Sequence, residues 1–244
     1  MSMFLILQLR PETEAADNEF HAILAKGGLS EDEVTRIRLD RDEVPADLDL
    51  TTYKGIILGG GPGCVSDDPA TKDPLEARME AIMLHLMPQI TDGDLPFMGC
   101  CAGIGLLAHH LNAHVSKDRF GEPIGPSTCT KTPEATADPL LADLPPVFDA
   151  FVGHKEAVQE LPAGCTHLLA STPCPFQMIR YGENVYATQF HPEADAAEFE
   201  ARIRIYKHRG YFAPEDADRL ITICQAADVT VPELILQRFV ARYR

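Results

Sequence analysis

The sequence predicts an α/β fold, in which an open and mostly parallel sheet is flanked by helices and followed by a C-terminal helical extension. Two observations predict it. Short apolar runs alternate with longer segments of helical periodicity, and two of these runs stop at glycines, as buried strands do before tight loops. The 244 residues are 45% hydrophobic and 24% charged, which is enough for one large domain with a core.

In the first half of the chain, predicted strands alternate with predicted helices. A helix is expected from about Pro11 toward Gly27, with acidic residues in its first turn, where the helix dipole favours them. The other helices of this half are expected over residues 75–86 and 102–111. The expected strands cover residues 3–9, 34–39, 55–58 and 95–98. Strands and helices that alternate at these lengths indicate a parallel sheet.

The second half changes in texture. From about residue 115 to 190, segments rich in proline, glycine and threonine separate short apolar pieces. Strands are expected over residues 147–152, 167–170, 177–181 and 185–189, the last two joined by a hairpin-like turn. After residue 193 the pattern is helical to the end, and Pro214 and Pro232 are suited to helix starts.

Charge and cysteine content exclude several classes of function. A formal net charge of −16 is unfavourable for binding nucleic acid or an anionic membrane. The first apolar run is too short for a signal peptide, and no run approaches a membrane span, so we expect a cytoplasmic protein. The seven cysteines form no CxxC pair, so we expect reduced thiols and no metal site.

Residues 96–108 are the most informative segment. They predict a strand, a sharp turn and a helix, with Gly99 and Gly103 two residues either side of Cys101. This is the pattern of a nucleophile elbow, with cysteine in place of serine. The turn aims the sulfur into the crevice at a helix N-terminus, where the dipole favours a thiolate, and the amide of Ala102 is placed to hold an oxyanion. The alternative is two buried, inert cysteines, and we assign that role to Cys100.

A second motif lies ninety residues downstream. His191-Pro192-Glu193 ends an apolar run, and its spacing lets the carboxylate of Glu193 orient the imidazole of His191. The alternative is a capping turn before the next helix. Because Cys–His–carboxylate chemistry needs spatial proximity only, we interpret Cys101, His191 and Glu193 as a catalytic triad.

These motifs carry a family resemblance. Three segments occur in the order found in the class I glutamine amidotransferases: residues 57–63 (ILGGGPG), 99–103 (GCCAG) and 189–193 (QFHPE). The chain resembles stand-alone proteins similar to the amidotransferase domain of GMP synthase, over roughly residues 55–193. Weaker matches lie at residues 121–125, 154–156, 161–164 and 180–182.

The resemblance implies a flavodoxin-like fold and a complete glutamine-hydrolysing site. Cys101 would attack the glutamine side-chain amide, with His191 relaying protons under the influence of Glu193 and no cofactor or metal required. The amides of Gly61 and Ala102 would form the oxyanion hole. Gly60, Gly105 and His154 would contact the substrate. We expect residues 1–195 to form the catalytic domain and residues 196–244 to be helices packed on it.

Two departures from the family pattern stand out. Ile104 and Gly105 replace a polar residue and a glutamine that helps hold the substrate in the family, and Gly59 replaces a frequent serine.

The glycine loop also lacks the Gly-Lys-Ser/Thr ending of a nucleotide-binding loop. The histidines at positions 109, 110 and 114 are interpreted as a solvated helix end rather than a metal site.

Three functions remain open at this point. The first is a glutamine amidotransferase or glutaminase; no ATP-binding motif is evident, so a separate ammonia-accepting synthetase is an allowed partner, as is a second copy in a homodimer. The second is a hydrolase of γ-glutamyl peptides or conjugates that uses the same triad, which the departures at residues 104 and 105 favour. The third is a catalytically silent regulatory protein on the same fold, against which the intact triad argues.

Overall fold

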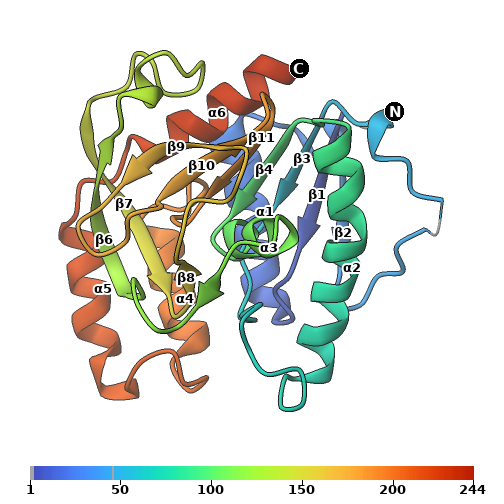
Figure 1. The fold of residues 1–244 in the computed structure, drawn as a ribbon. Coiled ribbons are helices and arrows are strands. Elements are labelled where there is room, and N and C mark those ends of the chain that lie inside the picture. Colours follow the sequence, from blue (N-terminus) through green and yellow to red (C-terminus); the bar gives the residue numbers. More distant parts are fainter. Residues whose placement is uncertain (1–2, 46) are drawn as a thin grey trace.

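A twisted sheet runs through the molecule with helices on both faces (Figure 1), as expected for an α/β fold. The computed structural model describes residues 3–45 and 47–244. Within those residues, nine strands form the main sheet in the order β2-β1-β3-β4-β11-β10-β9-β6-β7. The predicted fold class is therefore confirmed.

One half of the sheet is parallel and the other half antiparallel. The parallel half consists of β2 (Val34–Arg38), β1 (Phe4–Gln8), β3 (Gly55–Leu58), β4 (Phe97–Cys100) and β11 (Val185–Thr188). The antiparallel half consists of β10 (Met178–Tyr181), β9 (Cys165–Ala170), β6 (Glu122–Lys131) and β7 (Val147–His154). Strand β4 lies between β3 and β11, so its carboxyl end meets the ends of both neighbours.

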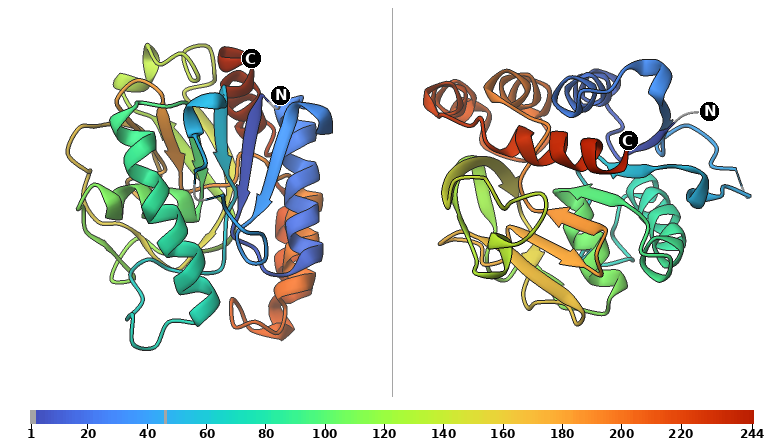
Figure 2. Two further views of the ribbon diagram at one scale, coloured as in Figure 1. Left: turned by 90° about the vertical axis from the view of Figure 1, so that its right-hand side faces the viewer. Right: turned by 90° about the horizontal axis from the view of Figure 1, so that it is seen from above.

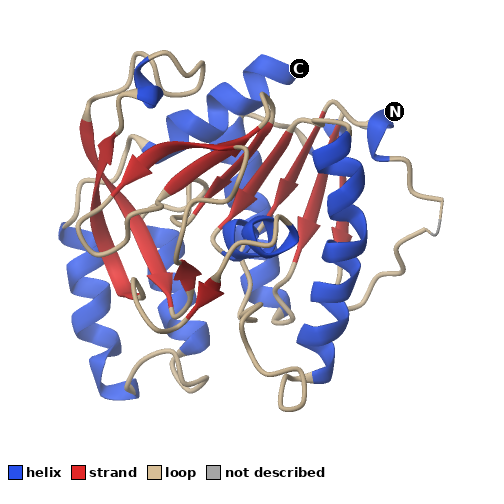
Figure 3. Ribbon diagram, viewed as in Figure 1, coloured by secondary structure: helices blue, strands red, loops and turns tan. Residues whose placement is uncertain are grey.

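The helices form one layer on each face of the sheet (Figures 2 and 3). One layer holds α1 (Thr13–Gly27), α4 (Ala196–Tyr206), α5 (Ala217–Ala226) and α6 (Pro232–Tyr243). The other holds α2 (Pro74–Asp92) and α3 (Ala102–His110). Four 3₁₀ turns are described, at Glu31–Glu33, Leu50–Thr52, Glu134–Thr136 and Pro214–Asp216.

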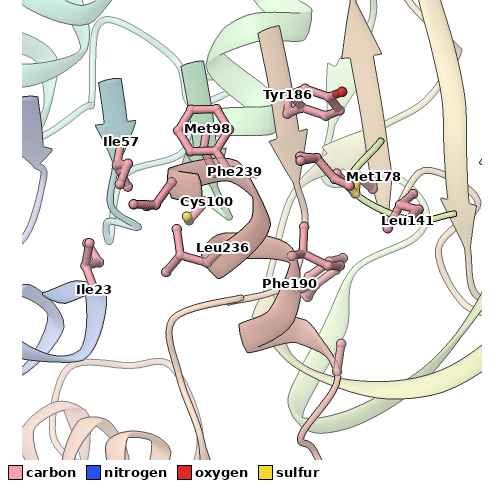
Figure 4. Close-up of a cluster of buried hydrophobic side chains, with 14 of the residues drawn as sticks. Ile23, Ile57, Met98, Cys100, Leu141, Met178, Tyr186, Phe190, Leu236 and Phe239 are labelled. Carbon is pink, nitrogen blue, oxygen red and sulfur yellow. The ribbon is translucent and has the colours of Figure 1, made fainter. Parts of the chain in front are cut away.

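Alternation of side chains along the strands builds a core on each face. In β1, Phe4 and Ile6 point to the α1/α6 layer, whereas Leu5 and Leu7 point to the α2/α3 layer, and all four are fully buried. A parallel strand covered on both faces needs such a continuous apolar run. Figure 4 shows the first of these cores, where α6 contributes Leu236 and Phe239.

Three features depart from the expected elements. The ten-residue strand β6 was not predicted, nor was the small sheet of β5 (Val115–Ser116) and β8 (Ala157–Val158). Strand β6 contains Pro123 and Pro126, and its ladder shifts register between Glu122 and Gly125. Helix α2 runs to Asp92 rather than ending at residue 86, and it contains Pro88. The helices beginning near Pro214 and Pro232 are confirmed.

No helix in the described part of the chain is long and apolar enough to cross a membrane.

Helix α6 offers a matched test of its contribution to the core. Leu236 is fully buried, whereas Leu234, two residues earlier, is 36% exposed. We expect Leu236→Ala to lower the free energy of unfolding by about 2–5 kcal/mol, because it removes buried methyl groups and leaves a cavity. Leu234→Ala should change it by less than about 0.5 kcal/mol. Urea titrations of both variants measure this, and equal losses would show that α6 does not pack as described.

Candidate active site

Cys101 lies at the turn between β4 and α3. Its backbone has φ 52° and ψ −94°, which is outside the regions that side-chain-bearing residues normally adopt. The turn is anchored to the neighbouring strand, because the Cys101 amide donates to the Thr188 carbonyl at 2.8 Å. This is the strained strand–turn–helix geometry that the sequence predicted for the elbow.

The glycines around the elbow have unequal roles. A Cβ on Gly99 would lie 2.8 Å from Cε1 of Phe97 and 3.1 Å from the Gly103 Cα, so the strand and the helix can approach only if residue 99 is glycine. A Cβ on Gly103 would meet only Leu58, at an ordinary 3.6 Å. A side chain would therefore collide with its surroundings at Gly99 but not at Gly103.

The two adjacent cysteines face different environments. Cys100 is fully buried, and its sulfur points into the core beside Leu236 and Ile57 (Figure 4). Cys101 is 9% exposed and borders a pocket. Burial raises the pKa of the Cys101 thiol to about 12, against the opposing effect of the Arg10 guanidinium. The thiol is therefore protonated at rest and needs a base to become a nucleophile.

His191 and Glu193 form a buried pair on the segment that follows β11. The Nδ1 of His191 lies 2.8 Å from Oε1 of Glu193, and both side chains are nearly inaccessible to solvent. Burial lowers the pKa of His191, although Glu193 opposes that shift, so the imidazole is neutral near pH 7. Burial alone would raise the pKa of Glu193, but His191 and Arg202 hold it well below its usual range. The pair is thus a neutral imidazole beside an ionised carboxylate.

The glycine loop after β3 leaves one amide unpaired near the thiol. The Gly59 amide donates to the Leu7 carbonyl at 2.9 Å, and the Gly60 amide donates to Oε1 of Glu19 at 3.0 Å. The amides of Gly61 and Ala102 have no protein acceptor within residues 3–45 and 47–244. Both residues border the same pocket as Cys101. Two free donors beside a nucleophile are what an oxyanion hole requires.

Gly60 brings the loop, the imidazole and the thiol together. A Cβ on this residue would stand 2.7 Å from Cε1 of His191, 2.9 Å from Nη2 of Arg10 and 3.6 Å from the Cys101 Cβ. His191 and Cys101 also line one cavity together. The elbow and the histidine, ninety residues apart in sequence, therefore meet across a single glycine.

The pocket beside Cys101 collects most of the predicted substrate contacts. It is lined by Gly61, Ala102, Gly105 and His154, together with Lys155, Glu156, Gln189 and Tyr211, among others. Gly60 does not line this pocket and instead packs behind it, against His191. Tyr211, from the segment that joins α4 and the turn before α5, lines this pocket and a neighbouring one.

Comparison with known proteins places the chain in a family. The family model for the class I glutamine amidotransferases matches residues 14–205. The chain belongs to the class I glutamine amidotransferases. GMP synthase from Thermosipho melanesiensis is 33% identical over 152 residues, which are 61% of this chain and 26% of that protein. GMP synthase from Streptococcus pneumoniae is 32% identical over 142 residues, 57% of this chain and 24% of that protein.

Solved structures show the same fold over nearly the whole chain. A glutamine amidotransferase from Thermotoga maritima has a TM-score of 0.69 at 21% identity and covers 98% of this chain and 99% of its own. A glutamine amidotransferase from Methylobacillus flagellatus has a TM-score of 0.68 at 20% identity, covering 100% of this chain and 96% of its own. This chain aligns with only about a quarter of each curated synthase, so those proteins extend well beyond the part that they share with it.

The structure gives a physical reason for the residues at both positions that depart from the amidotransferase pattern. A Cβ on Gly59 would stand 2.1 Å from Oε2 of Glu19, so no side chain fits there while Glu19 is present. A Cβ on Gly105 would lie 3.0 Å from Oε1 of Glu156. The carboxylate of Glu156 therefore stands in the space that a longer side chain at position 105 would enter. Ile104 is buried in the α2/α3 core.

His154 borders the pocket with both ring nitrogens already engaged. Its Nδ1 lies 2.8 Å from the Glu156 carbonyl and its Nε2 lies 3.0 Å from Oε2 of Glu122. With Cys174, these side chains form a buried group whose ligand-type atoms lie within 4.8 Å of one another, where a metal ion could be held. The Glu122 carboxylate also accepts hydrogen bonds from Ser127 and Gln177.

Several charged residues of the amidotransferase site were not found from the sequence. Glu19 on α1 is fully buried and accepts bonds from Gln8, Arg10 and the Gly60 amide. Arg202 on α4 donates to Glu193 at 2.9 Å. Each of these acidic and basic residues is isolated in sequence from its partner. The available signal in the sequence was a charged residue on an otherwise apolar face of a predicted helix. The same pattern is usual in solvent-exposed helices, so it did not identify these residues as part of the site.

Gly60 should tolerate no side chain. We expect Gly60→Ala to slow inactivation of the thiol by a glutamine-like diazo ketone at least about tenfold, because the added methyl displaces His191 from its place beside Cys101. The matched control is Gly63→Ala, whose Cβ would have 3.5 Å as its shortest contact. Comparable slowing in both variants would contradict the packing described around Gly60.

Proposed function

We propose that this chain hydrolyses the side-chain amide of glutamine, with Cys101 as nucleophile, His191 as general base and acid, and Glu193 as the group that orients the base. One observation carries the proposal. The elbow thiol, the buried His191–Glu193 pair and the two free amides of Gly61 and Ala102 come together from separate segments of the chain. Such an arrangement supports acyl transfer to a thiol.

The chemistry follows from the protonation states. The carboxylate of Glu193 can only accept, and it lies nearer to Nδ1 of His191 (2.8 Å) than the Arg202 donor does (3.1 Å). We therefore assign the His191 proton to Nδ1, which leaves Nε2 free to take the proton from the Cys101 thiol. The thiolate attacks the amide carbon, and the amides of Gly61 and Ala102 hold the resulting oxyanion. His191 then returns the proton to the leaving nitrogen, which departs as ammonia.

The second half of the reaction regenerates the thiol. The first half leaves a γ-glutamyl thioester on Cys101. A water molecule gives a proton to His191 and attacks the thioester carbon, and the collapsing intermediate releases glutamate while the sulfur recovers its proton. Neither half requires a redox change or a metal ion, since a thiol, an imidazole and two amides supply every proton and charge contact.

We further propose that the ammonia is used by a synthetase that is not part of the described chain. The support is the likeness to two GMP synthases whose names state that they hydrolyse glutamine, of which this chain spans about a quarter. A solved structure from Thermoplasma acidophilum, which carries the name of a GMP synthase component, has a TM-score of 0.59 at 21% identity. The likeness in fold supports a catalytic component of a larger assembly. The synthetase that accepts the ammonia is the part that we propose.

Replacing each of the adjacent cysteines identifies the nucleophile. We expect Cys101→Ala to abolish both glutamine hydrolysis, by at least about 10⁴-fold, and labelling by a glutamine-like diazo ketone. Cys100→Ala should keep both, because that sulfur points into the core (Figure 4). Mass spectrometry of the labelled protein locates the adduct. Labelling that persists in Cys101→Ala would rule out the proposed nucleophile and favour a catalytically silent protein.

The substrate is decided by comparing free glutamine with γ-glutamyl compounds. The absence of a side chain at Gly105 favours γ-glutamyl conjugates as a second candidate, because it leaves out the glutamine that the family uses to hold its substrate. Both candidates present the same α-ammonium and α-carboxylate groups, and the Glu156 carboxylate already accepts from Val65 and Ser66. The family likeness is therefore what favours free glutamine. We expect kcat/KM for free glutamine to exceed that for γ-glutamyl dipeptides. A higher kcat/KM for the dipeptides would assign the chain to the conjugate hydrolases.

A further inference from the structure

Arg202 reaches the proposed triad from the C-terminal helices. It lies on α4, and its side chain is 7% exposed. Its Nη2 donates to Oε1 of Glu193 at 2.9 Å, and its Nη1 lies 3.1 Å from Nδ1 of His191. A buried guanidinium in contact with both the carboxylate and the imidazole has no role in the chemistry set out above.

The donors and acceptors define what Arg202 does. Oε1 of Glu193 receives two donors, Nδ1–H of His191 and an N–H of Arg202. Nη1 of Arg202 lies 3.1 Å from Nδ1 of His191, so the guanidinium charge stands beside the ring and opposes its conversion to the imidazolium. The guanidinium therefore holds the carboxylate from one side and discourages the charged imidazolium.

The helix is built to hold Arg202 in this place. Asp195 caps α4 by accepting from the amides of Ala197 and Glu198, so the helix begins only three residues after Glu193. Phe199 lies one turn before Arg202, stacks edge-on against the His191 ring with 5.5 Å between centroids, and lies under the guanidinium at 5.6 Å. Phe199 and Arg202, on the same face of α4, therefore both contact the His191 ring.

We propose that Arg202 is a positioning residue, which holds Glu193 beside His191 and keeps the imidazole uncharged in the resting enzyme. The inference rests on the proposed function, because it assigns a role within that reaction. Arg202 touches the orienting carboxylate rather than the reacting atoms, so its effect is exerted through His191.

The charges around His191 come from several elements. Glu193 and Arg202 contact the ring directly, and Arg10, which follows β1 and pairs with Glu19 on α1, lines the same cavity. The Cys101 thiol faces the same cavity. Burial, Arg202 and Arg10 all lower the pKa of His191, and Glu193 alone opposes them. Removing the Arg202 charge should therefore raise the pKa of His191 and favour the inactive imidazolium.

The test compares Arg202→Met, Arg202→Lys and a control variant on the same helix. Arg204→Met is the control, because that side chain is exposed and, among the described residues, pairs only with Glu200. In the intact 244-residue chain, the acid limb of kcat/KM for glutamine should lie below about pH 6.5 for wild type and for Arg204→Met. In Arg202→Met it should move up by about one pH unit or more, with kcat lowered about tenfold and KM little changed. Arg202→Lys should keep the wild-type limb at a reduced kcat.

A nuclear magnetic resonance titration of His191 keeps the inference separate from the proposed function. The His191 signal is assigned by its loss in His191→Gln, and its pKa and tautomer are measured in each folded variant. A raised pKa in Arg202→Met, with the wild-type value in Arg204→Met, supports the role of Arg202 even if no glutamine is hydrolysed. An unchanged His191 titration in Arg202→Met overturns it and leaves Arg202 a structural residue, whatever the activity.

Discussion

The turn at Cys101 is the constraint on which the site depends. A non-glycine residue at φ 52° costs about 1–3 kcal/mol, and surrounding contacts must hold it there. The Thr188 carbonyl bonds its amide, and Gly99 lets the first turn of α3 approach β4. Because β4 lies between β3 and β11, the same turn sets the distance of the thiol from the glycine loop on one side and from His191 on the other.

Elements with strong local patterns could be predicted from the sequence, and elements made by distant pairing could not. The buried strands β1, β3 and β4 are apolar runs that no helix period explains, and glycines mark where two of them stop. Strand β6 carries two prolines and alternates small polar residues with buried ones. Its strand conformation comes from pairing with β7 and β9, which local propensity does not encode.

The candidate site divides in the same way. Cys101, His191 and Glu193 stand in short motifs, so their proximity in space could be predicted. The role of Arg202 could not, because nothing in its local sequence separates a buried arginine from the exposed Arg204 two residues later. Arg10 and Glu19 pair across nine residues of chain. Glu19 holds the glycine loop by accepting from the Gly60 amide, which lies forty-one residues further on. Only the fold brings such partners together.

Two buried Arg–Glu pairs hold the site. Glu19 and Arg10 fix the glycine loop, and Glu193 and Arg202 fix the imidazole. Buried ion pairs add little stability, because desolvation offsets much of their attraction, but loss of one partner leaves a costly uncompensated charge. Their contribution here is therefore geometric: each holds one wall of the cavity around Cys101. Helix α4 supplies one of those walls, so the C-terminal helices take part in shaping the site as well as covering the sheet.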